Sequence, residues 1–147
     1  MVETLLKYVS VYLGSMVKFI AGPIFGTAHQ LSVVETAVFS ILGMMTTVFI
    51  IMLIGGKSRE WLIRKLGLER KFSTGSYRFR KMWEEYGVPG IAFLTPLLFT
   101  PIGGAILAVM LGGSRRKIVK YMFVSAIFWG FTISFLFDRL GTAVFGF

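Results

Sequence analysis

The chain has 147 residues, of which 55% are hydrophobic and 16% are charged, and its mean hydropathy is +0.75. This balance excludes an ordinary soluble domain and favours a single integral membrane domain covering residues 1–147. The formal net charge of +9 would favour nucleic acid in a soluble protein. Here, however, most Lys and Arg lie beside apolar stretches, in Lys57–Lys81 and Arg115–Lys120. Such placement marks the cytoplasmic ends of spans, so we expect membrane lipids as partners and no nucleic acid.

The first segment, residues 2–20, predicts an amphipathic helix. Its polar residues recur at three- and four-residue spacing and therefore share one helical face, while Leu, Val, Tyr, Met and Phe fill the other faces. Such a helix either lies in the membrane interface or dips into the membrane with its polar stripe against protein. The stripe consists of Glu3, Lys7, Ser10, Gly14 and Lys18.

A break follows at Phe19–Leu31. Gly22 and Pro23 are expected to stop the helix, and Gly26 permits a tight turn. Only sixteen uncharged residues separate the flanking charges, whereas about 20 are needed to cross a bilayer as a helix. We therefore predict a re-entrant loop here, which enters and leaves the membrane on one side.

The next element, Val33–Gly56, is predicted to cross the membrane. Ser32 and Glu35 have the spacing of a capping box, which opens a helix. Lys57 places the end of this span in the cytoplasm and its start outside. Glu35 is expected to act in the cap, with a proton-linked role as the alternative. His29, at the outer face, is expected to be a polar interface residue, with a pH-sensitive contact as the alternative.

A basic loop, Lys57–Tyr86, is predicted on the cytoplasmic side. Apolar residues among the charges of 61–68 favour an amphipathic surface helix. Ser73–Ser76 is typical of a turn, and a second short helix is expected through Arg80–Glu85.

The stretch Tyr86–Ser114 contains twenty-nine residues without a charge, and both of its flanks are basic. A single crossing would export one of these basic flanks, which the positive-inside rule disfavours. Proline and glycine in the middle also interrupt a helix. We therefore predict a second re-entrant loop over Val88–Gly113, with its turn among Pro96, Thr100, Pro101, Gly103 and Gly104.

The last span is predicted at Lys117–Phe137, starting inside and ending outside. The fold class expected is therefore an all-α integral membrane protein made of two inverted repeats. Each repeat contains a re-entrant hairpin and a transmembrane helix, in residues 2–56 and 87–147, with the loop 57–86 between them. Inverted repeats with broken helices are typical of transporters.

Opposed re-entrant loops would meet near the middle of the membrane, where backbone groups freed by proline need partners. We therefore expect either a substrate or ion pathway at these loops or a packed structural plug. Arg115, Arg116 and Lys117 are head-group candidates, and the alternative is that they only anchor the topology. The pathway candidates are Pro23, Gly26, His29, Glu35, Pro96, Thr100, Pro101, Gly103 and Gly104.

The sequence favours no enzyme. It has a single His and no Cys, which leaves no plausible metal site and no thiol chemistry. Gly55-Gly-Lys-Ser58 has the end of a phosphate-binding loop, but Ile51 stands where the first glycine is required. We expect no cofactor.

Three motifs resemble the small multidrug export family: Tyr-Gly-Val-Pro-Gly at 86–90, Thr-Pro-Ile-Gly-Gly-Ala at 100–105, and Leu-Gly-Gly-Ser-Arg-Arg-Lys at 111–117. The layout is also similar to the wider DedA (SNARE-associated) superfamily. The resemblance implies inverted repeats of re-entrant loop and span, linked to lipid-carrier and proton-coupled transport.

The sequence thus predicts a small multi-pass transporter or exporter of an amphiphilic or anionic molecule, in the cell inner or plasma membrane. A polyprenyl-phosphate or phospholipid translocase (scramblase) is the first alternative, and a non-transporting membrane scaffold is the second. Because one protomer has little material to enclose a pathway, we expect a homodimer or larger assembly.

Overall fold

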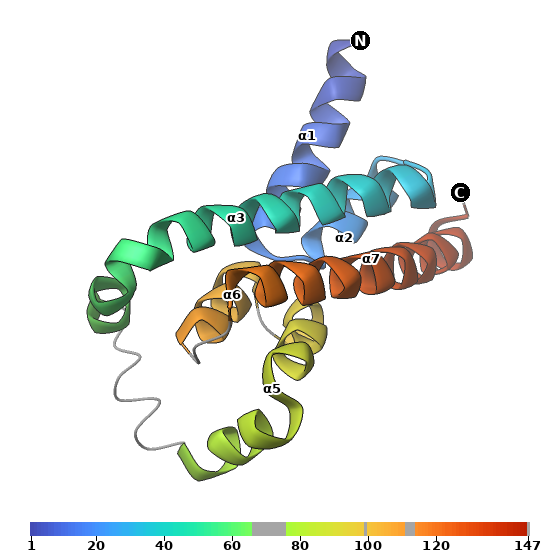
Figure 1. Ribbon diagram of the computed structural model, residues 1–147. Coiled ribbons are helices and arrows are strands. Elements are labelled where there is room, and N and C mark those ends of the chain that lie inside the picture. The colour runs from blue at the N-terminus through green and yellow to red at the C-terminus, as the bar shows by residue number, and fades with distance from the viewer. Residues whose placement is uncertain (66–75, 99, 111–113, 147) are drawn as a thin grey trace.

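A computed structural model describes residues 1–65, 76–98, 100–110 and 114–146, and within these ranges the chain is helical without a strand (Figure 1). The predicted all-α class is therefore confirmed for the described residues. Their helices are α1 (Val2–Val17), α2 (Ala21–Ala28), α3 (Val33–Lys65), α5 (Ser76–Leu98), α6 (Pro101–Met110) and α7 (Arg115–Phe145).

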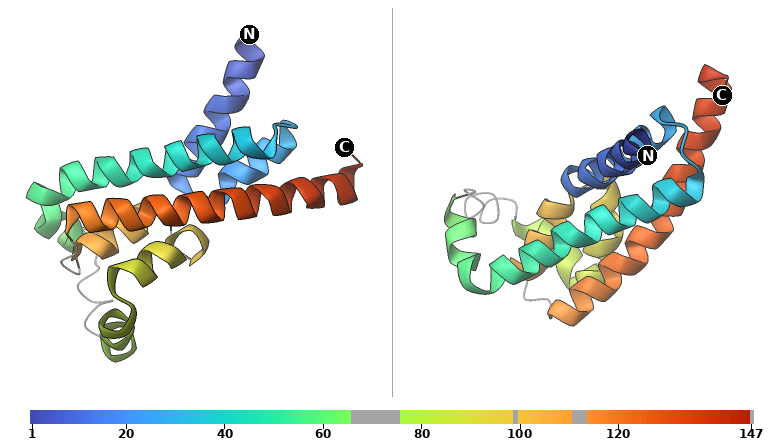
Figure 2. Two further views of the ribbon diagram at one scale, coloured as in Figure 1. Left: turned by 45° about the vertical axis from the view of Figure 1, so that its right-hand side comes forward. Right: turned by 90° about the horizontal axis from the view of Figure 1, so that it is seen from above.

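The two longest helices, α3 and α7, lie side by side and run in opposite directions (Figures 1 and 2). Both contain stretches that are long and apolar enough to cross a membrane, Val33–Ile54 and Arg115–Val144. The most apolar windows of these stretches are only 50% and 39% buried within the protein. A soluble core helix would be mostly covered, so the outward apolar faces are consistent with lipid contact. These two candidate spans coincide with the two that the sequence predicts.

The helix α3 is longer than predicted. It continues through Lys57 to Lys65 instead of ending at Gly56, and its last turns bend away from the axis of the apolar part (Figures 1 and 2). Charged residues end a membrane span but are good helix formers, so the backbone need not stop where the apolar stretch stops. The predicted surface helix at 61–68 therefore begins inside α3, and its end and most of the predicted turn 73–76 lie outside the described residues.

The first hairpin, α1–α2, differs from the prediction in two respects. The helix α1 already ends at Val17, with an extended backbone at Lys18, and Gly22-Pro23 lie in the first turn of α2. Proline suits a first helical turn because that position needs no amide donor. The face of α1 that packs inward carries the buried Val11 and Ser15, whereas the polar stripe stays half-buried or exposed.

The second hairpin, α5–α6, reverses the chain where the sequence predicts it. Within α5 the backbone kinks at Gly87, whose φ of 55° and ψ of −155° favour glycine. The predicted helix Arg80–Glu85 lies in the part of α5 before this kink. After the turn, the Thr100 hydroxyl accepts a hydrogen bond from the Gly103 amide at 3.1 Å, and Pro101 occupies the first helical position. This is an N-cap followed by an N1 proline, a strong helix start.

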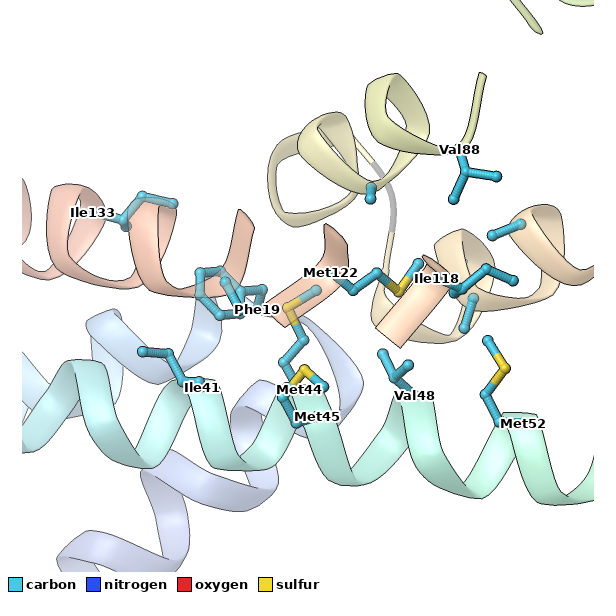
Figure 3. Close-up of a cluster of buried hydrophobic side chains, with 14 residues drawn as sticks. Phe19, Ile41, Met44, Met45, Val48, Met52, Val88, Ile118, Met122 and Ile133 are labelled. Carbon is cyan, nitrogen blue, oxygen red and sulfur yellow. The ribbon is translucent and has the colours of Figure 1, made fainter. Parts of the chain in front are cut away.

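Both hairpins pack on the α3–α7 pair around one apolar core (Figure 3). Phe19, at the tip of the first hairpin, is fully buried between α3 and α7. Met44 and Val48 of α3 face Ile118 and Met122 of α7 across the same core. The two hairpins also meet, because α1 contacts α6.

Candidate functional site

A groove of about 710 Å³ lies between α3 and α7 and is lined by residues of these two helices. Its wall is almost entirely apolar, with positively charged side chains at the end where α7 begins. A cavity of this size is in the range that holds a small organic molecule. The apolar wall consists of Ile41, Leu42, Met45, Phe49, Met52, Leu53, Val119 and Phe123, and the charged end consists of Arg115, Arg116 and Lys120.

Helical spacing places the charges on one face of α7. Arg116 and Lys120 are four residues apart, so they lie one above the other on the same side. The Ser114 side chain makes no capping hydrogen bond to α7, and a helix N-terminus favours an anion. Lys117 is exposed but does not line the groove.

Two of the three predicted head-group candidates therefore meet in the groove, and the third does not. Lys120 takes the place expected for Lys117. The sequence contained the signal that would have found it, because the spacing from Arg116 to Lys120 is one helical turn.

Two smaller cavities lie at the other end of the molecule, where α2 meets the C-terminal part of α7. One has a volume of about 310 Å³ and is lined by polar residues that include Gln30, Asp138 and Thr142. The other, of about 470 Å³, is apolar. Gln30 has a positive φ of 57°, because it ends α2 in the left-handed position that glycine usually takes. The Leu31 and Gln30 amides complete this end by donating to the Gly26 and Thr27 carbonyls.

The candidates of the first hairpin lie in tight helix contacts. Gly26 is buried against Thr36 of α3, and a Cβ at this position would overlap the threonine side chain. Gly22, next to the buried Pro23, lies in the same way against the hydroxyls of Ser15 and Ser40. Within the described part of the chain these two buried hydroxyls have no hydrogen-bond partner.

Glu35 and His29 stand at the start of α3 and the end of α2. The predicted capping box is confirmed: the Glu35 carboxylate accepts from the Ser32 amide at 3.0 Å, and the Glu35 amide donates to the Ser32 hydroxyl at 3.3 Å. The Tyr8 hydroxyl also donates to this carboxylate, at 2.7 Å. This hydrogen bond is the main reason that the pKa of Tyr8 is raised above its ordinary value of 10.0. His29 is half-buried at the C-cap of α2.

The candidates of the second hairpin also pack closely. Pro96 and Pro101 are fully buried. Gly104 lies against Thr95 so closely that a Cβ would overlap the threonine side chain, whereas a Cβ at Gly103 would meet only the Thr100 hydroxyl, at 3.3 Å.

Carbonyl groups in both hairpins receive side-chain donors from the long helices. The Phe93 carbonyl, just before Pro96, accepts from the Trp129 indole at 2.9 Å and from the Ser125 hydroxyl at 3.4 Å. In the first half, the Thr47 hydroxyl donates at 3.0 Å to the Met16 carbonyl near the end of α1. A carbonyl near Pro96 and a carbonyl near the end of α1 are thus hydrogen-bonded by protein side chains.

None of the nine pathway candidates lines the groove or the two smaller cavities formed by described residues. Their role in a pathway stays a prediction. Among the described residues, no group of three or more His, Asp or Glu could hold a metal ion. No family model, curated protein or solved structure matches this chain. The resemblance to the small multidrug export family likewise stays a prediction.

Proposed function

We propose that this protein is a small membrane transporter that binds an anionic amphiphile in the α3–α7 groove. One observation carries the proposal: eight apolar side chains lead directly to three cations at one end of the same groove. An apolar wall favours a hydrocarbon tail, because its burial removes apolar surface from water or from a poorer packing environment. The cations and the N-terminus of α7 favour a phosphate or carboxylate.

The arrangement of the helices supports a membrane location for this site. Positive charge at the start of α7 favours the cytoplasmic side, and the end of α3 lies at the same side because the two helices are antiparallel (Figure 1). Each half consists of a hairpin followed by a long helix, and the two long helices run in opposite directions. We infer from this that the hairpins are re-entrant and that the halves are inverted repeats in the inner or plasma membrane.

The binding part of the proposal is tested with phosphatidylglycerol, which is anionic, and phosphatidylcholine, which is zwitterionic, carrying the same fluorescent acyl chain. Purified protein in detergent is expected to bind the anionic lipid more tightly. Replacing Arg115 and Arg116 by Ala should weaken binding of the anionic lipid by about tenfold or more and leave binding of the zwitterionic lipid nearly unchanged. This is the effect expected when charge-assisted contacts are lost. Lys117→Ala is the matched control, because it removes a neighbouring charge outside the groove. Equal binding of both lipids by the unmodified protein would contradict the proposal.

Two other functions are favoured by particular observations. A phospholipid or polyprenyl-phosphate translocase would use the same groove and cations, and lipid movement between leaflets of reconstituted vesicles would separate it from export of a water-soluble anion. A non-transporting scaffold is favoured by the protein donors on the Phe93 and Met16 carbonyls, since these carbonyls need no ligand. Lipid binding without any movement of lipid or solute across vesicles would support the scaffold. The predicted homodimer is tested by crosslinking in membranes.

A further inference from the structure

The geometry points to Lys18 as a second binding residue for the anionic head group, positioned at the middle of the membrane. This inference rests on the proposed function and extends it, because the groove places cations only at one membrane face. A head group that crosses needs a favourable site between the two faces. Lys18 is exposed, and it lies at the tip of the first hairpin, directly after α1.

The depth of Lys18 follows from its neighbours. The Met16 carbonyl, two residues before it, accepts a hydrogen bond from Thr47 in the second half of the candidate span Val33–Ile54. Phe19, the next residue, lies against Gly130 together with Ile41. Gly130 is midway along the candidate span Arg115–Val144. Contacts to both spans therefore place the hairpin tip near the centre of the membrane.

A lysine at this depth cannot reach the membrane surface. The hydrocarbon core is about 30 Å thick, so the centre is roughly 15 Å from either face, which is well beyond the reach of a four-carbon side chain. Charged side chains at membrane depth are costly and usually have a partner of opposite charge. An anion beside Lys18 would offset this cost.

The described carboxylates do not supply that anion. Glu3 is fifteen residues earlier on α1, roughly 22 Å away along the helix. Glu35 is held by Tyr8 and Ser32 at the start of α3. Asp138 is eight residues beyond Gly130 on α7, roughly 12 Å towards the outer end. Among the side chains that the structure describes, none pairs with Lys18.

A ligand anion fits this position better than a second copy of the chain. A second copy would bring its own Lys18 and the same carboxylates, which lie far from the membrane centre. The phosphate or carboxylate of the amphiphile is the anion proposed for the basic end of the groove, and it would pass this depth if the amphiphile crosses the membrane. A simpler structural role is that Lys18 stabilises the C-terminal end of α1 through the helix dipole.

The test uses full-length protein reconstituted in vesicles, with the movement of fluorescent phosphatidylglycerol and phosphatidylcholine between leaflets as the measurement. We expect Lys18→Gln to slow the movement of the anionic lipid between leaflets by about tenfold or more. The same effect is expected for Lys18→Met, which removes the charge but keeps the apolar stem. Movement of the zwitterionic lipid should change much less, and Lys18→Arg should restore the anionic rate. Lys7→Gln is the matched control, because it removes the same charge from the outer part of α1.

The possible results separate the inference from the proposed function. Suppose that the unmodified protein moves anionic lipid, and that Lys18→Gln and Lys18→Met move it equally fast. The proposed role of Lys18 would then be wrong, and the groove proposal would stand. If both variants slow the two lipids equally and lower the melting temperature, Lys18 acts only on the stability of α1. If the unmodified protein neither binds nor moves anionic lipid, the proposed function fails and the role of Lys18 fails with it. Efficient disulfide-linked dimers of Lys18→Cys would place this residue at a subunit contact and overturn the inference.

Discussion

The two hairpins, α1–α2 and α5–α6, bring their arms together in the same way: a glycine of the second arm lies against a hydroxyl side chain of the first. Gly22 lies against Ser15 in the first hairpin, and Gly104 lies against Thr95 in the second. Small residues let helices approach closely, which is how helices associate in a membrane without a hydrophobic driving force. In both halves the following long helix also donates a side-chain hydrogen bond to a hairpin carbonyl.

The hairpins differ in how fully their polar groups are satisfied. In the second, the Thr95 hydroxyl donates to the Ile91 carbonyl at 2.7 Å, and Thr100 caps α6. In the first, the buried Ser15 hydroxyl has no partner within the described chain, and the tip carries the charged Lys18. Satisfied polar groups make a rigid structural element, whereas a buried unsatisfied group is costly and rare in folded proteins. The second hairpin therefore has satisfied polar groups at these positions, whereas the first has a buried hydroxyl and an exposed lysine without a described partner.

The largest effect is expected for Gly104→Ala. The added methyl would overlap the Thr95 side chain, so the two arms must separate, at a cost of about 2–3 kcal/mol in the free energy of unfolding. Gly103→Ala is the control one residue away, where a Cβ meets only the Thr100 hydroxyl at 3.3 Å. It should be neutral or stabilising by up to about 1 kcal/mol, because alanine favours helix. Denaturant unfolding in detergent micelles measures both, and equal losses would show that close packing at Gly104 is unimportant.

Removing the side-chain donor that a long helix supplies to a hairpin carbonyl should lower the free energy of unfolding by a similar amount in the two halves. Thr47→Val in the first half and Trp129→Phe in the second each leave a hairpin carbonyl with fewer donors, at an expected cost of about 1–2 kcal/mol. Thr132→Val is the control, because its exposed hydroxyl bonds only within its own helix. A loss confined to one half, measured by the same unfolding assay, would break the correspondence between the hairpins.

The cap at Thr100 tests whether the second hairpin is a structural element. Thr100→Ala removes the acceptor for the Gly103 amide and is expected to cost about 1 kcal/mol of stability. Thr100→Ser keeps an acceptor and should retain most of the stability. Lipid binding at the groove should remain unchanged in both variants. A loss of binding with unchanged stability would assign Thr100 to a pathway instead.

The smallest effect is expected at Gln30, where the left-handed backbone is occupied by a residue other than glycine. Gln30→Gly removes a conformational cost of about 1–2 kcal/mol but increases the entropy of the unfolded chain, so we expect a net gain of about 0.5 kcal/mol. Gln30→Val, which is β-branched, should lower the melting temperature. If glycine instead destabilises the protein, then contacts of the Gln30 side chain outweigh its backbone strain.

Much of the fold could be predicted because its signals are local. The two candidate spans follow from uninterrupted apolar runs. The spacing of Ser32 and Glu35 alone predicts a helix start. The reversal of the chain between Pro96 and Gly104 follows from the two basic flanks of an uncharged stretch and from the prolines and glycines in its middle. The end of α3 was misplaced because a change from apolar to charged residues marks the end of a span, not of a helix.

The candidate site was predictable only in part. Composition indicated that Arg115 and Arg116 stand at the start of a helix beside an apolar stretch, and this is a property of the chain alone. That Lys120 and not Lys117 faces the groove depends on how α7 is rotated against α3.

The sequence by itself determined where the apolar spans lie, which of their ends is basic, and where the second hairpin reverses, because each of these depends on neighbouring residues. The tertiary structure decided which polar groups find partners: Trp129 on the Phe93 carbonyl, Tyr8 on Glu35, and nothing described on Lys18. Such pairs join residues far apart in the chain, so they follow from the crossing and rotation of packed helices, which local patterns do not specify.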